Sequence, residues 1–550
     1  MSTSYRKLFL TILLFLNAAG YAHCQNKQEK LIVFHLDFNS VSLKKEYVIK
    51  WLQKASQMGY NAVLWEIEDD VKWETCPECT SPDAFTKEEF KEIIAYSRTL
   101  GLEPIPLLQT IGHAEYVLQH EKYFSFREDP TRYDCYCTSN ESVKDFLKKW
   151  IKEYIELFGE LRYFHLGGDE AYAFATCEIC KSTAEKIGEN KLYADYLNDI
   201  AQPLLSKNIR PGIWCDMMLS HPEQIEVISK EFVIWDWNYW DGDATPQRVM
   251  VWGKGRISKE KISEEIKLVF PEIINQDGEL NSFYTSDVLS RYGYDVILSS
   301  TSRSHGDAVF AGRNDLYVDN IIGAARKTAE DNLLGTCVTS WAVRIPNHET
   351  QEPWLYLAPL TINNPNLTKD EILLQTSKEL FGYESLEVFE VFNRIGYPFP
   401  FAGEKSTGIM WTGLKDSKPA PPNYINELID GWVEKEKWDD VNSQVLQSTE
   451  IITSGIQKFN DITTKFTKGF EIQYNWSKAA HFQFWQSIIA KEIVNKVNGG
   501  NTKTKKEMIE LIGLLKHDYI NWGNDWMTEK SAKQNAGLIY DAIENYFKHN

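Results

Sequence analysis

Two adjacent carboxylates, Asp169 and Glu170, are the side chains of this sequence best suited to acid–base chemistry. They follow an apolar, strand-like run and the pair Gly167-Gly168, which lets a ligand approach the backbone closely. Neighbouring carboxyl groups are costly to hold together unless they do work such as proton transfer. The alternative is structural, with one acid capping the helix that follows the strand. The glycines and the apolar run favour the catalytic interpretation.

The cysteines offer a second kind of chemistry. The sequence contains two Cys-x-x-Cys pairs, Cys76/Cys79 and Cys177/Cys180, and a further pair, Cys135 and Cys137. Two Cys-x-x-Cys pairs that meet in space are the ligand set of a structural Zn²⁺ site. The other interpretation is a pair of disulfides, which an oxidising compartment favours. Both remain open from the sequence, and neither is catalytic, because four thiolates leave no open position for water.

Short apolar runs predict the strands that must position these residues. Most are apolar at consecutive positions, as strands buried on both faces of a parallel sheet are. Helical periodicity fills the intervals, as in Leu43–Met58 and Ser142–Phe158. Eight alternations of strand and helix predict an α/β fold, a (β/α)8 TIM barrel. The predicted strands are Leu31–Phe38, Asn61–Glu68, Glu103–Thr110, Tyr163–Glu170, Arg210–Met217, Glu231–Trp237, Asp295–Ser302 and Leu334–Ala342.

Three irregular parts complete the predicted organisation. The fifth and sixth strands are so close in sequence that the helix between them must be short. The long segment Asp241–Leu280 is expected to fold over the active face. Beyond about Pro365 the pattern is helical, with Pro419–Pro422 as a stiff linker. We therefore predict a barrel over residues 25–400 and an all-α C-terminal module over residues 420–550.

The charge and the N-terminus restrict the partners and the location. The net charge of −19 argues against nucleic acid, and the 18 Trp mildly favour carbohydrate, because Trp covers the apolar face of a sugar. Arg6 and Lys7 precede a short apolar run that ends in small residues, which predicts a signal peptide over residues 1–24. We expect an exported, soluble protein in the periplasm or outside the cell. Lipid anchoring at Cys24 is the less favoured alternative.

The motif at Asp169-Glu170 extends into a wider pattern. The segment His165–Tyr172 resembles the signature of glycoside hydrolase family 20, the β-N-acetylhexosaminidases, and most resembles the hexosaminidase D type. Ile105–His113, Ile213–Met217 and Val233–Asp236 resemble the third, fifth and sixth strands of that family. The similarity covers roughly Leu31 to Glu352.

The resemblance implies substrate-assisted catalysis, without a cofactor. In this family the 2-acetamido oxygen of the substrate is the nucleophile. Carried over, Glu170 protonates the departing oxygen and later deprotonates water, while Asp169 orients the acetamide and stabilises an oxazolinium ion. The charge of Asp169 is expected to raise the pKa of Glu170. Because adjacent side chains on a regular strand point apart, a bend after Gly167-Gly168 is part of this hypothesis.

The resemblance also implies a set of sugar-binding residues, less closely matched. His113 is expected near the catalytic acid, although a plain loop histidine is the alternative. The family arginine that grips the sugar is not evident, and the seventh strand lacks the Tyr-Leu-Asp of the larger members. Further candidates are Trp214, Trp235 and Trp341 for an aromatic box around the acetamide; Asp37, Glu66, Glu68 and Asp69 for sugar hydroxyls; and Tyr239, Arg303 and Asp307 as substitutes for the missing groups.

These implications predict an exo-acting retaining hydrolase that removes terminal β-linked GlcNAc or GalNAc from a glycan or glycoconjugate. Two alternatives stay open. A disaccharide-releasing relative such as a lacto-N-biosidase requires a longer cleft, which the path of Asp241–Leu280 decides. A non-catalytic glycan-binding barrel is the second, since fold alone does not fix activity.

Overall fold

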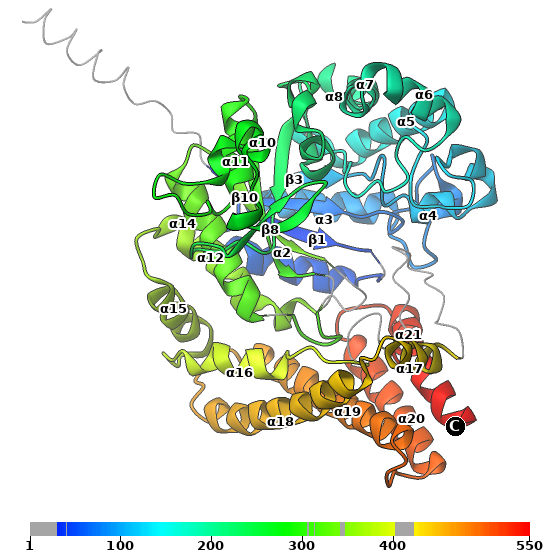
Figure 1. Cartoon of the computed structure of the whole chain (residues 1–550), viewed down its shortest axis with the longest axis vertical. Helices are drawn as coiled ribbons and strands as arrows, with labels where there is room; N and C mark the ends of the chain where they lie inside the picture. The colour runs from blue at the N-terminus through cyan, green and yellow to red at the C-terminus, as the bar shows by residue number, and fades with distance from the viewer. Residues whose placement is uncertain (1–29, 40, 305–306, 313, 342–346, 402–422) are drawn as a thin grey trace, which may run out of the picture.

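The computed structural model describes residues 30–39, 41–304, 307–312, 314–341, 347–401 and 423–550 (Figure 1). The predicted signal peptide and the predicted linker Pro419–Pro422 lie outside these residues. Among the described helices, none combines the length and the apolar composition that a bilayer span requires.

Eight parallel strands close into a barrel, as the sequence predicted. They follow one another around the barrel in the order β1-β10-β9-β6-β5-β4-β3-β2. Pairing of Leu31 with Gly335 joins the first strand to the last. The strands are β1 (Leu31–Asp37), β2 (Ala62–Glu66), β3 (Glu103–Leu107), β4 (Tyr163–His165), β5 (Arg210–Trp214), β6 (Val233–Trp237), β9 (Asp295–Arg303) and β10 (Gly335–Ser340).

Burial on both faces explains why these segments are continuously apolar. Every residue of β1 is buried, because its alternate side chains face the barrel interior and the surrounding helices. The helices that cover the barrel present one apolar face to it. One of them begins with a capping box, in which the side chain of Thr86 accepts from the backbone of Glu89 and the Glu89 side chain accepts in return. These covering helices include α2 (Lys45–Met58), α3 (Lys87–Thr99), α5 (Glu141–Phe158) and α12 (Asn314–Glu330).

The irregular connections lie where they were expected. Between β5 and β6 the chain forms only the short helix α9 (Asp216–Leu219) and the 3-10 turn η3 (Pro222–Val227). The segment after β6 contains the hairpin of β7 (Arg248–Val251) and β8 (Gly255–Ser258). It continues through α10 (Glu264–Val269) and α11 (Tyr284–Arg291). After β4 come α6 (Glu178–Ile187), α7 (Glu189–Ile200) and α8 (Gln202–Leu205).

The remainder of the described chain is helical and packs against the barrel, and from Lys369 onward it lies below the barrel in Figure 1. The backbone N–H groups of Lys44 and Thr528 donate across this contact, to Trp526 and Ser42. Helix α16, which the predicted boundaries assign to the barrel, packs on α18. The helices are α13 (Glu352–Leu355), α14 (Leu357–Asn363), α15 (Lys369–Phe381), α16 (Glu387–Ile395), α17 (Tyr424–Glu434), α18 (Trp438–Thr463), α19 (Phe470–Val497), α20 (Lys505–Gly523) and α21 (Glu529–His549).

Candidate active site

A cavity of about 470 Å³ opens at the carboxyl ends of the barrel strands. This is the face on which barrels of this kind build their active sites, and the volume falls in the range of small-molecule sites. Its lining combines seven Trp or Tyr side chains with eight polar side chains. The lining residues are Asp37, Asn39, Glu66, Gln109, His113, Asp169, Glu170, Trp214, Trp237, Tyr239, Trp240, Met250, Trp252, Ser304, Leu316, Tyr317 and Trp341.

Asp169 and Glu170 both face this cavity, because the chain bends as it leaves β4. The backbone φ angles of Gly167, Gly168 and Glu170 are +64°, +90° and +43°. A regular strand would direct adjacent side chains to opposite faces, and these left-handed conformations break that alternation. The bend that the catalytic hypothesis requires is therefore present. A non-glycine residue with positive φ is strained, and such strain gathers at functional sites.

The glycines before the carboxylates serve a different purpose from the one expected. A Cβ atom on Gly167 would lie 2.1 Å from Oε1 of Gln109, and one on Gly168 would lie 2.6 Å from the Tyr193 hydroxyl. The space that they free is thus occupied by protein side chains and not by a ligand. Gly112 plays a similar part, since its Cβ would lie 2.1 Å from the backbone oxygen of Asp169. The glycines permit the bend and the close packing of the two loops.

The two carboxylates have unequal surroundings. Asp169 is buried, and its Oδ1 atom has no hydrogen-bond partner among the described residues. Burial raises the pKa of Asp169 above its usual value, although His113 partly opposes the shift. Glu170 is more exposed, and its Oε1 accepts a 2.7 Å hydrogen bond from the hydroxyl of Tyr172. Asp169 therefore has a buried acceptor oxygen without a donor among the described residues, whereas Glu170 is partly exposed to solvent.

His113 joins the two acids. Its Nε2 atom lies 3.4 Å from Oδ2 of Asp169 and 3.4 Å from Oε2 of Glu170. Burial alone would lower the pKa of His113, but Asp169 and Glu170 raise it well above its usual value. The two carboxylates therefore favour the protonated, cationic form of the imidazole. From the sequence we expected the charge of Asp169 to set the proton affinity of Glu170. The structure adds His113, a group that can carry a positive charge, beside both acids.

Asp216 is a site residue that sequence reasoning missed. Its Oδ2 accepts the backbone N–H of Glu170 at 2.9 Å, and its Oδ1 accepts the indole N–H of Trp237 at 3.2 Å. Burial, with the nearby charge of Asp169, raises the pKa of Asp216 to about 7. Its position directly after β5 was the available signal, since acids at strand ends gather on the active face.

Aromatic side chains form one wall of the cavity. Trp214 and Trp341 line it with ring centroids 5.9 Å apart, and the indole N–H of Trp341 donates to the hydroxyl of Tyr239 at 2.9 Å. Trp235 does not reach the cavity. It is buried inside the barrel, edge-on to Trp214, and Trp237 lines the cavity in its place. Inward-facing residues recur every second position, so Trp237 occupies the next layer toward the open end.

Glu66 anchors a polar network on the opposite side. It accepts from the side-chain amide of Gln109 at 2.8 Å, and His35 Nε2 lies 3.1 Å from its other oxygen. Because His35 Nδ1 accepts the backbone N–H of Ser340, Nε2 carries the proton and donates to Glu66. Asp37 lines the cavity beside this network. The Oε1 atom of Gln109 is buried and has no hydrogen-bond partner in the described part of the chain.

Four predicted sugar contacts lie away from the cavity lining. Glu68 and Asp69 are buried in the loop after β2. Arg303 is buried and donates to the backbone oxygens of residues 308 and 309. Asp307 accepts from the Tyr317 hydroxyl at 2.7 Å and from the backbone of residue 304 at 3.0 Å. Arg303 and Asp307 thus hold the loop after β9 in shape, and it is Ser304 and Tyr317 that line the cavity.

The two Cys-x-x-Cys pairs do not combine. Cys76 and Cys79 form a disulfide with each other, buried in the main core, so their sulfurs are already used. Cys177 and Cys180 instead meet Cys137, whose Sγ lies 3.8 Å and 3.7 Å from theirs. The predicted Zn²⁺ site of Cys76, Cys79, Cys177 and Cys180 is therefore wrong, and the alternative of disulfides holds for Cys76–Cys79 but not for Cys177 and Cys180. Spacing along the chain identified the pairs but not their partners.

Comparisons with known proteins identify a family and several relatives that this chain resembles. Residues 35–255 match the family model described as glycosyl hydrolase family 20, catalytic domain. Hexosaminidase D of Bos taurus is 28% identical over 213 residues, which cover 37% of this chain and 62% of the relative. Hexosaminidase D of Homo sapiens is 27% identical over 214 residues, covering 37% and 44%. The chain thus matches less than two thirds of the length of either relative.

Two solved structures complete the comparison. A β-N-acetylhexosaminidase from Bacteroides fragilis NCTC 9343 has a TM-score of 0.45 and 18% sequence identity, covering 70% of this chain and 75% of that chain. Dispersin B has a TM-score of 0.41 and 16% identity, covering 61% and 98%.

Proposed function

Because residues 35–255 match the catalytic-domain model of glycosyl hydrolase family 20, we propose that the protein is an exo-acting β-N-acetylhexosaminidase. It removes a terminal β-linked GlcNAc or GalNAc from a glycan with retention of configuration. The observation that carries the proposal is the joint placement of Asp169 and Glu170 on one cavity, with Oδ1 of Asp169 buried and unpartnered among the described residues. A buried acceptor of this kind needs a donor, and the acetamide N–H of the substrate is one.

The proposed reaction uses the substrate's own amide. Asp169 accepts the acetamide N–H and so turns the carbonyl oxygen toward the anomeric carbon. That oxygen attacks as the bond to the leaving oxygen breaks, and Glu170 gives the leaving oxygen its proton. The negative charge of Asp169 stabilises the resulting oxazolinium ion. Glu170 then takes a proton from water, which attacks the anomeric carbon from the side of the departed group and opens the ring with retention.

In this scheme His113 supplies the proton that Glu170 donates to the leaving oxygen. As a cation it lies 3.4 Å from both carboxylates, so a proton is stored beside Glu170 even when Glu170 is ionised. Substrate binding places the acetamide against Asp169 and covers the site, and the lower polarity favours transfer of that proton to Glu170. His113 would then be neutral while Glu170 acts as the acid.

The aromatic wall suits the acetamide methyl group and the apolar face of the sugar. Trp214 and Trp341 lie beside each other in the cavity, and the buried indole N–H of Trp214 has no acceptor in the described part of the chain. A ligand oxygen could satisfy it. Such a wall excludes water from the oxazolinium ion and restricts the acetamide to reactive geometries.

The path of the segment after β6 favours removal of one sugar over removal of a disaccharide. Its β7–β8 hairpin contributes Met250 and Trp252 to the cavity wall, so this side of the site is covered. A lacto-N-biosidase type requires space there for a second sugar. A purely glycan-binding role is less favoured, since it has no use for two acids bridged by a cationic histidine.

We also propose that the protein acts in the periplasm or outside the cell, on the strength of the predicted signal peptide. Mass spectrometry of the N-terminus from the natural host would test this. Cleavage near residue 24 is the expected result, and an intact N-terminus on the mature protein would contradict it.

Release of 4-nitrophenol from its β-GlcNAc and β-GalNAc glycosides tests the activity. We expect turnover of at least one, and Glu170→Gln should reduce kcat by about 10² to 10⁴-fold. Tyr172→Phe is the matched control, because it removes a hydrogen bond to the same carboxylate but leaves the acid in place. It should retain kcat within about tenfold. Absence of turnover of both glycosides would contradict the proposal, and release from the disaccharide glycosides alone would favour the disaccharide-releasing alternative.

A further inference from the structure

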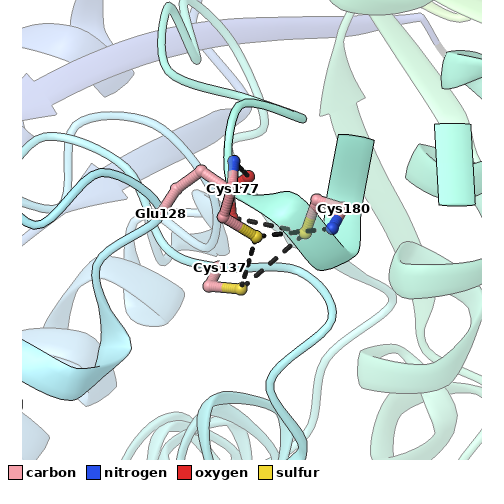
Figure 2. Close-up of side chains that lie close together, drawn as sticks. All are labelled: Glu128, Cys137, Cys177 and Cys180. Atoms are coloured by element: carbon pink, nitrogen blue, oxygen red, sulfur yellow. Dashed lines mark hydrogen bonds between the residues drawn. The ribbon is translucent and has the colours of Figure 1, made fainter. Parts of the chain in front are cut away.

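A cluster of four ligand-type side chains lies outside the cavity, between two loops of the active face (Figure 2). The side chains are Glu128, Cys137, Cys177 and Cys180, and one ligand atom from each lies within 4.8 Å of all the others. We propose that these residues form a structural Zn²⁺ site with three thiolates and one carboxylate. This inference is independent of the proposed glycosidase function.

The separations between the ligand atoms fit a tetrahedral zinc ion. With Zn–S bonds of about 2.3 Å, tetrahedral geometry places two sulfurs about 3.8 Å apart. Cys137 Sγ lies 3.8 Å from Cys177 Sγ and 3.7 Å from Cys180 Sγ. A Zn–O bond of about 2.0 Å similarly places a carboxylate oxygen about 3.5 Å from a sulfur. The distance from Glu128 Oε2 to Cys180 Sγ is 3.3 Å.

The local backbone prepares these ligands. Cys177 is the N-cap of α6, and the backbone N–H of Cys180 donates to Cys177 Sγ at 3.3 Å. This bond stabilises a thiolate over a thiol. Glu128 and Cys137 lie on two antiparallel segments bonded to each other, with the N–H of Cys137 donating to the backbone oxygen of Phe126 at 2.8 Å. The site therefore needs little rearrangement to accept an ion.

The surroundings of the four ligands complete the case for a cation. Glu128 Oε1 accepts the backbone N–H of Cys177 at 2.9 Å, which orients the other oxygen toward the sulfurs. Ser139 Oγ lies 3.0 Å from Cys180 Sγ. No positive side chain in the described part of the chain forms an ion pair with Glu128. Four groups that ionise to anions, with Glu128 and Cys180 buried, thus share one place without a compensating charge.

The position of the cluster gives the ion a role. Glu128 and Cys137 belong to the connection between β3 and α5, which also carries His113. Cys177 and Cys180 lie at the N-cap and in the first turn of α6, which follows the loop from β4 that carries Asp169 and Glu170. An ion held from both sides fastens the loop of the histidine to the loop of the two acids. Four protein ligands leave no open position, so its role is structural.

Metal analysis of the full chain tests the proposal. The protein is produced in zinc-supplemented medium and purified without a metal-affinity tag, and the expected content is about one zinc per chain. Absence of zinc, both as purified and after incubation with equimolar Zn²⁺, would overturn the proposal, as would preferential retention of another metal.

Variants locate the ion. Cys137→Ser should weaken Zn²⁺ binding by about 100-fold or more, measured by competition with a chromophoric chelator. Cys135→Ala is the matched control, because Cys135 lies two residues away with its sulfur on the backbone oxygen of Tyr136. It should keep the affinity of the unchanged protein. Equal affinity of Cys137→Ser and the unchanged protein would place the ion elsewhere.

Two further measurements keep the test decisive if Cys137→Ser does not fold. Co²⁺ bound to the unchanged protein should show intense sulfur-to-cobalt charge transfer and tetrahedral d–d bands, and Glu128→Gln should shift those bands while keeping the acceptor for the Cys177 N–H. Alkylation without reductant followed by mass spectrometry should find Cys137, Cys177 and Cys180 as thiols beside an oxidised Cys76–Cys79 pair. A disulfide among the three would overturn the proposal.

Discussion

The backbone N–H of Glu170 donates a 2.9 Å hydrogen bond to Oδ2 of Asp216. Glu170 has a φ of +43° and is the strained non-glycine residue of the bend after β4. The hydrogen bond to Asp216 holds its backbone in this conformation. It also connects the end of β4 to the end of β5, so the direction of the Glu170 side chain depends on a neighbouring strand. Asp216 is therefore a positioning residue for the proposed acid.

Removing this acceptor should impair the reaction more than substrate binding. We expect Asp216→Ala to lower kcat on a 4-nitrophenyl glycoside by about 10²-fold with a smaller change in KM, because a displacement near 1 Å of a reacting group has that cost. Asp216→Asn keeps one acceptor oxygen and should recover part of the loss. The matched control is Asp195→Ala, which removes an exposed ion pair with Lys191 on α7. Unchanged kcat in Asp216→Ala would contradict the assigned role.

Gly112 allows the loop after β3 to contact the loop after β4. In Gly112→Ala the new Cβ meets the backbone oxygen of Asp169 at 2.1 Å and the backbone nitrogen of Ala171 at 3.2 Å, and backbone atoms must move. We expect a loss of about 1–3 kcal/mol in the free energy of unfolding. Activity should fall with it, because Asp169 is displaced.

Gly513 provides the contrasting substitution. It lies inside helix α20, and a Cβ atom added there would have no neighbouring atom within 4 Å. Gly513→Ala should therefore raise the free energy of unfolding by about 0.5–1 kcal/mol. Urea denaturation of both variants gives the comparison. A Gly112→Ala protein as stable and active as the unchanged one would show that the two loops are not packed as described.

The pH dependence of kcat/KM should report His113 and Asp169. Because the pKa of His113 is raised well above its usual value, its cation persists through neutral pH and is lost as pH rises through that raised pKa. Activity should then fall on the alkaline side. At the acid end, activity needs ionised Asp169, whose pKa burial raises above 3.8, so the acid limb should lie above pH 3.8.

His113→Asn separates these two limbs. It should remove the alkaline limb and lower the maximal kcat/KM by about 10²-fold or more. Removing the cation should also move the acid limb upward, since His113 favours the ionised form of Asp169. An alkaline limb that is identical in the variant would assign that titration to another group.

The β7–β8 hairpin, which forms part of the cavity wall, should contribute more to substrate binding than to the chemical step. Trp252 lies between β7 and β8, contacts Trp237 with ring centroids 4.5 Å apart and lines the cavity. Trp252→Ala should raise KM for a chitobiose-type substrate by about tenfold with kcat within about threefold. The control is Leu268→Ala on α10, where the side chain is 87% exposed. A large loss of kcat with constant KM would contradict this division.

The sequence predicted the barrel well because its strands are buried on both faces and read as continuous apolar runs. Every predicted strand is present, and the differences lie at the ends, where Asn61–Glu68 shortens to Ala62–Glu66. The position of Asp169 and Glu170 on the cavity could also be predicted, because the residues that follow the strands of such a barrel gather on one face.

Contacts between distant segments could not be predicted in the same way. Trp237 and not Trp235 lines the cavity, because the depth of a layer depends on how all eight strands are staggered. The partnership of Cys137 with Cys177 and Cys180 depends on where two long loops meet, which residue spacing does not encode. Arg303 looked free to bind a sugar, yet it satisfies backbone oxygens of its own loop.

The central claim is that the acetamide oxygen of the substrate is the nucleophile. Weakening that nucleophile tests the claim most directly. In 4-nitrophenyl β-glucosaminides whose N-acetyl group carries none, one, two or three fluorines, the amide oxygen becomes a progressively weaker nucleophile while the leaving group stays constant. If that oxygen attacks the anomeric carbon beside Asp169, kcat/KM should fall steadily across the series, by about 10²-fold or more in total. A value that stays within about threefold across all four substrates would show that a different group attacks, and would contradict the account.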